Sequence, residues 1–270
     1  MYKAFSPKLS LKESIPIAVK FGYGGIGLNV GGEFQNDPLA LKAMLDEHGL
    51  KSAGFGFPVN FRESQETFDA DMKKLPSHCE FATKMGDFRC STWLLPGSDV
   101  PFAENFAMHA KRLREAALVM AQYGVKFGLE FVGPPSARKN SKYPFVYDLE
   151  SLMNLWDAIG CDNVGILLDA WHWDMAGQTF ADFTKINGKV VVVHINDAPA
   201  GVPVEEQKDN VRALPGATGV LRIKEFFQGL LDMQYDGPVY SEPFYAPLNE
   251  MPYEEAMRVE TDAINKVWPK

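Results

Sequence analysis

The stretch GILLDAWHWD, residues 165–174, begins as an unbroken apolar run and ends in charged and aromatic side chains. A short run of this kind is typical of a strand buried on both faces, as in a parallel sheet. The strand predicted here covers residues 164–168 and is followed at once by Asp169, with His172 three residues further along. A carboxylate and an imidazole at the end of a buried strand mark a candidate functional site. The other predicted strands decide whether that site has further members.

Strand-like and helix-like segments alternate along the whole chain. Short runs rich in β-branched or aromatic residues predict strands at residues 2–5, 25–30, 52–55, 89–94, 126–131, 164–168, 190–195 and 239–241. Segments with apolar residues at helical spacing predict helices at residues 11–21, 38–48, 61–85 with a break near Pro76, 101–123, 148–159, 221–233 and 253–268. No Ser/Gly-rich linker divides this alternation, so residues 1–270 are predicted to form a single domain.

About eight strand–helix units in 270 residues predict a closed (β/α)8 TIM barrel, an α/β fold that typically needs about 250 residues. A doubly wound open sheet is the alternative. The nucleotide-binding form of that fold carries a glycine-rich loop after its first strand, but residues 5–10, FSPKLS, contain no glycine. The stretch GYGGIG, residues 22–27, leads into a predicted strand instead of following one. We therefore interpret it as a helix-to-strand turn.

The composition points away from large anionic partners. The chain is 46% hydrophobic and carries a formal net charge of -8, so we expect neither nucleic acid nor an anionic membrane to be its main partner. It has no apolar run near the 18 or so residues that span a bilayer, and no signal-peptide core at its start. Cys79, Cys90 and Cys161 cannot all pair with one another, which favours buried thiols in a reducing, cytoplasmic setting.

The last four predicted strands share the polar ending seen at Asp169. They end on Glu130, Asp169, His194 and Glu242. The strands of a barrel present these ends to one axial space, where three buried carboxylates without a cation would be very costly. One imidazole among carboxylates suits Mn²⁺ best, with Mg²⁺, Co²⁺ or Zn²⁺ as alternatives. Taken singly, each carboxylate could instead cap a helix or form a rim ion pair, and the histidine could be a core residue.

These endings and the residues around them resemble one known family. The matching pieces are GLEFVG (128–133), LLDAWHW (167–173), VVHINDAP (192–199), VRALPGATG (211–219) and YSEPF (240–244). They resemble the xylose isomerase-like TIM-barrel superfamily, which holds the sugar phosphate isomerase/epimerase family. The resemblance implies a metal bound by Glu130, Asp169, His194 and Glu242, and a substrate oxygen contacted by His172. It also implies proton exchange between the two glutamates and a substrate carbon, and homo-oligomers are common in the family.

The sequence departs from the ketose 3-epimerases of that superfamily in two places. They carry an arginine six residues after the strand-seven histidine, where this chain has Ala200, and a second acid six residues after the strand-five glutamate, where it has Ser136. Both losses weaken the expectation of free-ketose 3-epimerisation. Arg212 is then the nearest basic candidate for substrate binding, and an ion pair that holds its loop is the alternative.

Tryptophans near the predicted strand ends are further candidates for substrate binding. Trp93, Trp171 and Trp173 could stack on the apolar face of a sugar, or simply pack at the rim.

Together these features predict a metal-dependent isomerase or epimerase acting on a small-molecule carbohydrate: a sugar, keto-sugar or polyol. Glu130 and Glu242 would transfer protons through a metal-stabilised enediolate. A lyase of the same superfamily, either inosose dehydratase-like or eliminating a keto-glycoside, is the alternative because the same intermediate serves it. A DNA-repair endonuclease would need more metal ligands and a basic groove. A non-catalytic sugar-binding barrel would be expected to lack a ligand, and none of the four is missing here.

Overall fold

A computed structural model describes residues 1–32 and 34–270 of the chain. Its centre is a closed barrel of parallel strands in the order β1-β10-β9-β8-β6-β4-β3-β2. The barrel strands are β1 (Tyr2–Phe5), β2 (Gly25–Leu28), β3 (Lys51–Gly56), β4 (Arg89–Trp93), β6 (Lys126–Glu130), β8 (Val164–Asp169), β9 (Val190–Ile195) and β10 (Pro238–Ser241). Each coincides with a predicted strand to within about two residues, and closure of the ring confirms the (β/α)8 barrel over the open sheet.

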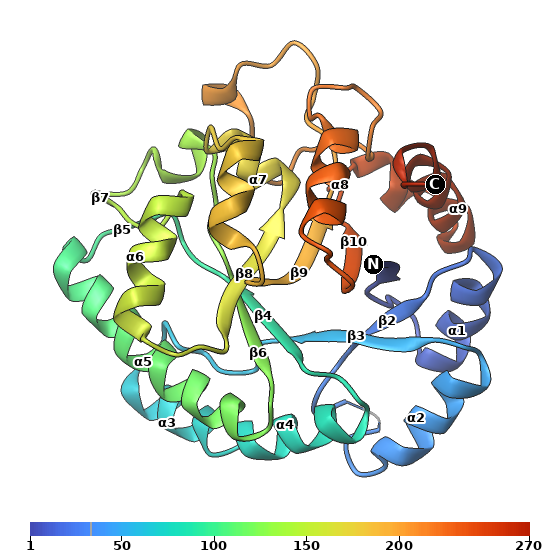
Figure 1. Cartoon of the computed structure of the whole chain (residues 1–270), viewed down its shortest axis with the longest axis horizontal. Helices are drawn as coiled ribbons and strands as arrows, with labels where there is room; N and C mark the ends of the chain where they lie inside the picture. The colour runs from blue at the N-terminus through green and yellow to red at the C-terminus, as the bar shows by residue number, and fades with distance from the viewer. Residues whose placement is uncertain (33) are drawn as a thin grey trace.

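Helices surround the barrel (Figure 1). The longer ones are α1 (Leu11–Lys20), α2 (Pro38–Glu47), α3 (Gln65–Met72), α4 (Leu75–Lys84), α5 (Phe102–Gln122), α6 (Leu149–Ile159), α8 (Ile223–Asp232) and α9 (Tyr253–Val267). The predicted break near Pro76 is present, because Pro76 stands in the first turn of α4, where its missing N–H costs nothing. The preceding helix begins at Ser64, whose side chain accepts a hydrogen bond from the Thr67 N–H. Among the described residues, no helix is long and apolar enough to cross a membrane.

Several short elements lie outside the sequence-based prediction. They are the helix α7 (Ala170–Met175), the antiparallel pair β5 (Gly97–Ser98) and β7 (Tyr143–Pro144), and the 3-10 turns η1 (Pro135–Arg138), η2 (Phe180–Ile186), η3 (Val204–Glu206) and η4 (Ala246–Glu250). All but β5 lie in the connections between β6 and α9. Elements of two to seven residues are too short to leave a periodic hydrophobic pattern, which explains why they were missed.

The stretch 165–174 lies at the centre of the packing. All six residues of β8 are buried. Gly165 allows the backbone of β9 to come close, since a Cβ at this position would stand 2.1 Å from the Lys189 carbonyl oxygen. The strand register then pairs Asp169 with His194, and His194 with Tyr240. The carboxyl ends of β8, β9 and β10 are therefore side by side, and this is the end of a barrel where catalytic groups gather.

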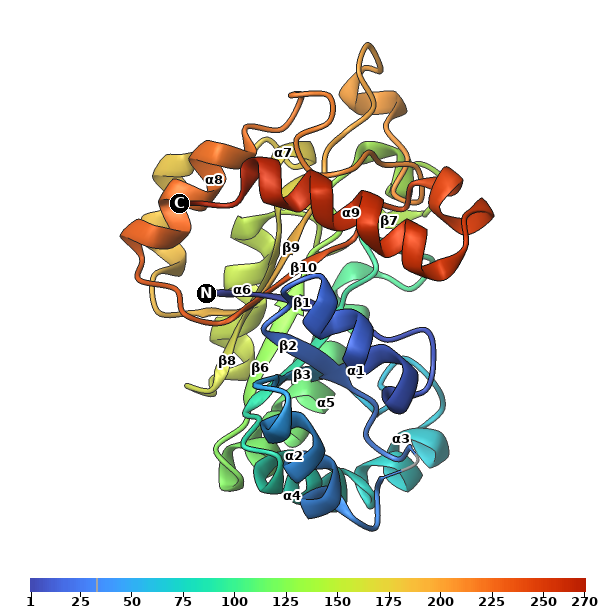
Figure 2. The ribbon, with the colours of Figure 1, turned by 90° about the vertical axis from the view of Figure 1, so that its right-hand side faces the viewer.

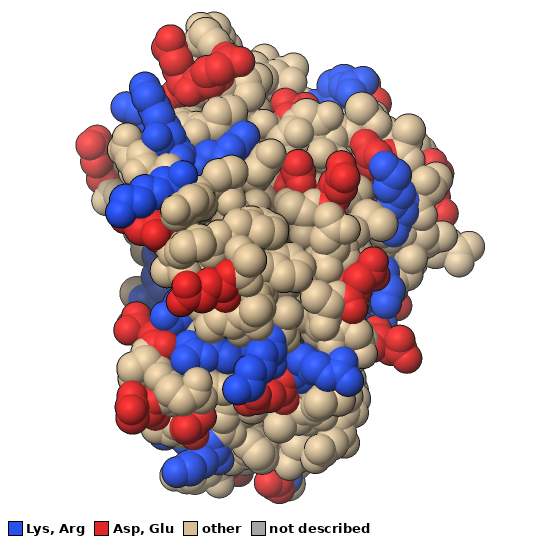
Figure 3. Space-filling view, turned by 90° about the vertical axis from the view of Figure 1, so that its left-hand side faces the viewer, with Lys and Arg blue, Asp and Glu red and all other residues tan. Residues whose placement is uncertain are grey.

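The C-terminal helix α9 packs on one side of the barrel, and the surface carries charges of both signs. Figure 2 shows α9 lying in front of β9 and β10, above β1 and α1. Figure 3 shows one side of the molecule, on which basic and acidic side chains are interspersed.

Candidate functional site

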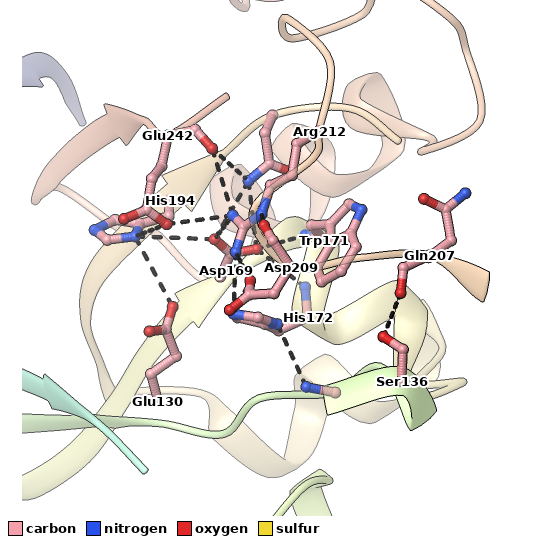
Figure 4. Close-up of polar contacts among 12 residues, drawn as sticks. Glu130, Ser136, Asp169, Trp171, His172, His194, Gln207, Asp209, Arg212 and Glu242 are labelled. Atoms are coloured by element: carbon pink, nitrogen blue, oxygen red, sulfur yellow. Dashed lines mark hydrogen bonds and ion pairs between the residues drawn. The ribbon is translucent and has the colours of Figure 1, made fainter. Parts of the chain in front are cut away.

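The four predicted ligands meet at the carboxyl end of the barrel (Figure 4). The Nδ1 atom of His194 lies 3.4 Å from Glu242 Oε2, 3.9 Å from Glu130 Oε1 and 3.9 Å from Asp169 Oδ2. Ligand atoms of Glu130, Asp169 and His194 all lie within 4.8 Å of one another. The barrel therefore brings together side chains that are spread from residue 130 to residue 242 of the sequence. Below, the four are called the ligand cluster.

The spacing in the ligand cluster suits a shared cation better than direct hydrogen bonds. Glu130 Oε1 and His194 Nδ1 are buried, and neither has a hydrogen-bond partner among the residues that the structure describes. Their separation of 3.9 Å is too long for a hydrogen bond. It still allows both atoms to bind one metal ion, since two ligand atoms that each stand about 2 Å from the ion can be up to about 4 Å apart. Three carboxylates and an imidazole also form a donor set that divalent cations accept.

Electrostatics within the ligand cluster show the strain of three carboxylates in one buried place. Burial raises the pKa of Glu130 well above its usual range, and the charges of Asp169 and Glu242 raise it further. Burial would also raise the pKa of Asp169, but the Arg212 guanidinium overrides it and holds that pKa at about 2. Glu130 is thus the carboxyl that keeps a proton most readily when only protein charges surround it. A bound cation would stabilise the charged form of Glu130 and so counter both the effect of burial and the repulsion from Asp169 and Glu242.

Arg212 is part of the site, in contact with two members of the ligand cluster. Its Nη1 donates to Asp169 Oδ2 at 2.9 Å and to Glu242 Oε2 at 3.2 Å. Its Nη2 donates to Asp209 Oδ1 at 2.6 Å, and its guanidinium lies 4.7 Å from the centre of the Trp171 ring. The sequence left open a substrate contact or an ion pair, and the structure shows a buried ion-pair network. Its fixed positive charge offsets part of the negative charge of the ligand cluster.

Asp169 makes two sets of contacts, because it ends β8 and also caps α7. Its Oδ1 accepts from the Trp171 N–H at 2.6 Å and from the His172 N–H at 3.0 Å, while Oδ2 faces His194 and Arg212. The helix-cap interpretation and the metal-ligand interpretation therefore apply to different oxygens of one side chain. The same cap fixes the start of α7 and with it the position of His172.

His172 lies beside the ligand cluster, next to Arg212. Its Nδ1 lies 3.3 Å from the Gly133 backbone nitrogen, and its Nε2 lies 3.1 Å from Arg212 Nη2 and 3.5 Å from Asp209 Oδ1. Burial lowers the pKa of His172 to about 4, so the ring is neutral at physiological pH. A neutral imidazole beside the ligand cluster can bind an oxygen of a ligand, and the substrate contact expected for His172 stays a prediction.

The prediction from the sequence did not include two polar residues that contact the site, Asn196 and Asp209. Asn196 is fully buried, and its Nδ2 donates to Asp169 Oδ2 at 3.3 Å. Asp209 pairs with Arg212 three residues later. The signal for Asn196 was its place two residues after His194 in the same strand-end motif. An acid three residues before a basic residue is too common to have identified Asp209.

The predicted aromatic contacts divide into two groups. Trp171 and Trp173 are 0% and 2% exposed, and Trp173 packs edge-on against Phe183 with ring centroids 5.1 Å apart. Both are packed in the core instead of at the rim, and they show almost no ring surface to a cavity. Trp93 and Phe244 are each 48% exposed, and the guanidinium of Arg62 lies 4.3 Å from the centre of the Trp93 ring.

A cavity of about 470 Å³ adjoins the ligand cluster. His194 and Glu242 form part of its wall, and the remainder comes from the loop after β1, the segment after β10 and one side of α9. Its volume lies in the range of small-molecule sites. A second cavity, of about 550 Å³, lies at the opposite end of the strands around Lys126, Asn163 and Lys189, away from the ligand cluster.

Comparison with known proteins supports this description of the fold. A family model described as xylose isomerase-like TIM barrel matches residues 15–264. An inosose isomerase from Halalkalibacterium halodurans is 29% identical over 159 residues, which are 58% of this chain and 53% of that protein. The chain thus matches about half the length of this curated relative. A 2-oxo-tetronate isomerase from Haemophilus influenzae is 28% identical over 228 residues, 78% of each protein.

Solved structures share the whole architecture. A xylose isomerase domain protein from Alicyclobacillus acidocaldarius superposes with a TM-score of 0.87 at 29% identity, covering 98% of this chain and 97% of the other. A structure described as IOLI protein with a binding zinc atom superposes with a TM-score of 0.80 at 20% identity, over the full length of both chains. At that identity the second likeness concerns the fold alone.

Proposed function

Because the chain belongs to the family of xylose isomerase-like TIM barrels, we propose that it is a divalent-metal-dependent isomerase or epimerase of a sugar, keto-sugar or polyol. The observation that carries this proposal is the ligand cluster: ligand atoms of Glu130, Asp169 and His194 lie within 4.8 Å of one another, and Glu242 lies 3.4 Å from His194. The names of its relatives, inosose isomerase and 2-oxo-tetronate isomerase, support carbohydrate chemistry of this kind.

Glu130, Asp169, His194 and Glu242 would hold the metal. When bound there, a divalent cation supplies a Lewis acid that polarises a carbonyl and stabilises negative charge on neighbouring oxygens. Mn²⁺ is the ion we propose, since the donor set is mostly oxygen, with Mg²⁺, Co²⁺ and Zn²⁺ as alternatives. The zinc atom named for the IOLI protein agrees with a divalent ion in a related fold.

The two glutamates are the groups that would move protons. Glu130 ends β6 and Glu242 follows β10, with β8 and β9 between these two strands in the barrel. Carboxyls so separated can reach a substrate from different sides, so one removes a proton next to a carbonyl and the other returns one. Return to the opposite face of the same carbon epimerises the substrate, and return to the neighbouring carbon isomerises it. Loss of a leaving group from the same intermediate gives the lyase alternative, and the curated relatives include inosose dehydratases.

Arg212 and His172 would orient the substrate and keep the charges balanced. Arg212 holds Asp169 and Glu242 in place from the side occupied by Asp209. His172, neutral and fixed by the Gly133 N–H, presents Nε2 toward the same region. Trp93 stands exposed at the end of the strand that pairs with β6, where it can cover an apolar sugar face.

The decisive experiment joins metal analysis to isotope exchange. Purified protein is assayed for bound metal, loaded with Mn²⁺ and incubated with a panel of keto-sugars and keto-polyols in D₂O. We expect deuterium in at least one substrate, and its loss in Glu130→Gln and in Glu242→Gln. The control is Glu255→Gln, an exposed glutamate of α9 whose ion-pair partner is Arg258. Exchange that survives in both site variants would exclude the two-glutamate scheme, and an unsaturated product would establish the lyase alternative.

A further inference from the structure

The cavity beside the ligand cluster has a polar wall that the proposed reaction does not use. Glu260 projects from α9 into this cavity, and Lys8, Ser241 and Tyr253 line it as well. We call Glu260, Ser241 and Tyr253 the α9 wall. The wall shares the cavity with His194 and Glu242, so a molecule bound at the ligand cluster can extend along it.

Polar atoms of the α9 wall lack partners. Ser241 Oγ and Tyr253 Oη are buried and make no hydrogen bond of ordinary geometry to any residue that the structure describes. Within the same described residues, Glu260 forms no ion pair within 4.0 Å. Burial raises the pKa of Glu260, and the nearby Ser241 and Lys8 offset this only in part. Burying two hydroxyls without partners is costly, so their retention needs a cause, and the half-buried Glu260 carboxylate lines the same cavity.

We propose that the α9 wall binds the hydroxyl groups of the non-reacting end of the substrate, and that Glu260 selects uncharged sugars over their phosphate esters. This inference rests on the proposed function, since it assumes a carbohydrate whose reacting end lies at the ligand cluster. Sugar hydroxyls donate to a carboxylate and both donate to and accept from Ser241 and Tyr253, so they satisfy all three groups. A phosphate offers acceptor oxygens and negative charge, which Glu260 repels.

The rest of the cavity agrees with an uncharged, polyhydroxylated ligand. Phe5 and Met257 supply apolar surface that suits the C–H faces of a sugar. Lys8 is the basic residue among those that line the cavity, and it is exposed at the rim. A built phosphate site would be expected to offer backbone N–H groups or a fixed arginine fork instead of one exposed lysine beside a half-buried glutamate.

The test compares Glu260→Gln with Glu255→Gln, which removes an exposed carboxylate from the same helix. The probes are D-fructose, D-tagatose and the 6-phosphate of each, titrated by calorimetry into Mn²⁺-loaded protein, with deuterium exchange measured in parallel. We expect at least one free ketose to bind the wild type tenfold or more tightly than its phosphate. Glu260→Gln should lower the affinity for that ketose roughly tenfold, which corresponds to the loss of one charge-assisted hydrogen bond. It should also reduce the ratio between the affinities for the free ketose and for its phosphate. It should raise KM far more than it lowers kcat, and Glu255→Gln should match the wild type.

The outcomes separate this proposal from the proposed reaction. Tighter binding of a 6-phosphate by the wild type, no binding of any of the four probes, or equal affinities in the two variants would each overturn the selection by Glu260. Binding that follows the expected pattern without deuterium exchange would uphold the α9 wall and overturn only the proton-transfer reaction. Thermal unfolding of Glu260→Gln at or above the wild-type temperature would show that the variant is folded.

Discussion

Arg212 gives the sharpest prediction, because it supplies a buried positive charge to carboxylates that a metal would also neutralise. Its side chain is 1% exposed and donates to Asp169, Glu242 and Asp209. Replacing it with methionine keeps a similar side-chain volume but leaves these carboxylates without their positively charged partner. Removing one partner of a buried ion pair costs about 3–5 kcal/mol. At about 2–4 °C per kcal/mol for a chain of this size, the Tm of metal-free Arg212→Met should fall by roughly 10 °C.

Metal should then stabilise the variant more than the wild type. The ligand cluster has one more uncompensated negative charge in Arg212→Met, so an added divalent ion meets less competition and gains more attraction. The assay is thermal unfolding in EDTA and in Mn²⁺, with Arg258→Met as the matched control. Arg258 forms exposed pairs with Glu255 and Asp262, worth less than about 1 kcal/mol.

Two results would refute this reasoning. A metal-free Tm for Arg212→Met within a degree of that for Arg258→Met would show that the guanidinium is no counter-charge. An equal rise in Tm with Mn²⁺ in the wild type and in Arg212→Met would show that the metal and Arg212 do not share carboxylates.

Two further predictions concern the frame that holds the site. Burial lowers the pKa of His109 from 6.5 to about 4. Between these two pH values the unfolded chain binds a proton at His109 and the folded chain does not, so the stability of the folded state falls as the pH drops from 6.5 toward 4. The loss approaches about 3 kcal/mol, and urea unfolding at pH 7 and pH 4.5 should show a smaller difference in His109→Gln than in the wild type. Gly165→Ala should destabilise the barrel by about 3 kcal/mol, since its Cβ would meet the Lys189 carbonyl oxygen at 2.1 Å. Gly56→Ala, where a Cβ meets nothing within 4 Å, should stay within about 1 kcal/mol in the same urea titration, and equal losses would contradict the steric explanation.

The strand ends were predictable from the sequence because an apolar strand stops visibly where a polar residue appears. Glu130, Asp169, His194 and Glu242 could each be identified in this way, and the TIM-barrel fold implied that they face one space. What the sequence could not provide was the strand register. The pairing of Asp169 with His194 depends on how β8 shifts against β9 between Ile166 and Leu167. Such an irregularity leaves no periodic trace in either strand.

Burial around the site was less predictable than position. Trp171 and Trp173 flank His172, and on sequence alone an indole there could either stack on a sugar or pack at the rim. The structure buries both indoles in the core, because Asp169 caps α7 and the helix turns its tryptophans into the protein. A helix of six residues carries too few turns for its buried face to show in the sequence.

The cap formed by Asp169 explains why the stretch 165–174 has its particular order of residues. An aspartate used only as a metal ligand would leave the two N–H groups of Trp171 and His172 without partners in a buried place. An aspartate used only as a cap would have no need of a second oxygen aimed at His194 and Arg212. Because one oxygen fixes the start of α7 and the other enters the ligand cluster, the placement of His172 is mechanically tied to the placement of the proposed metal. The buried strand, the proposed metal ligand and the proposed substrate contact are thus encoded within residues 164–172.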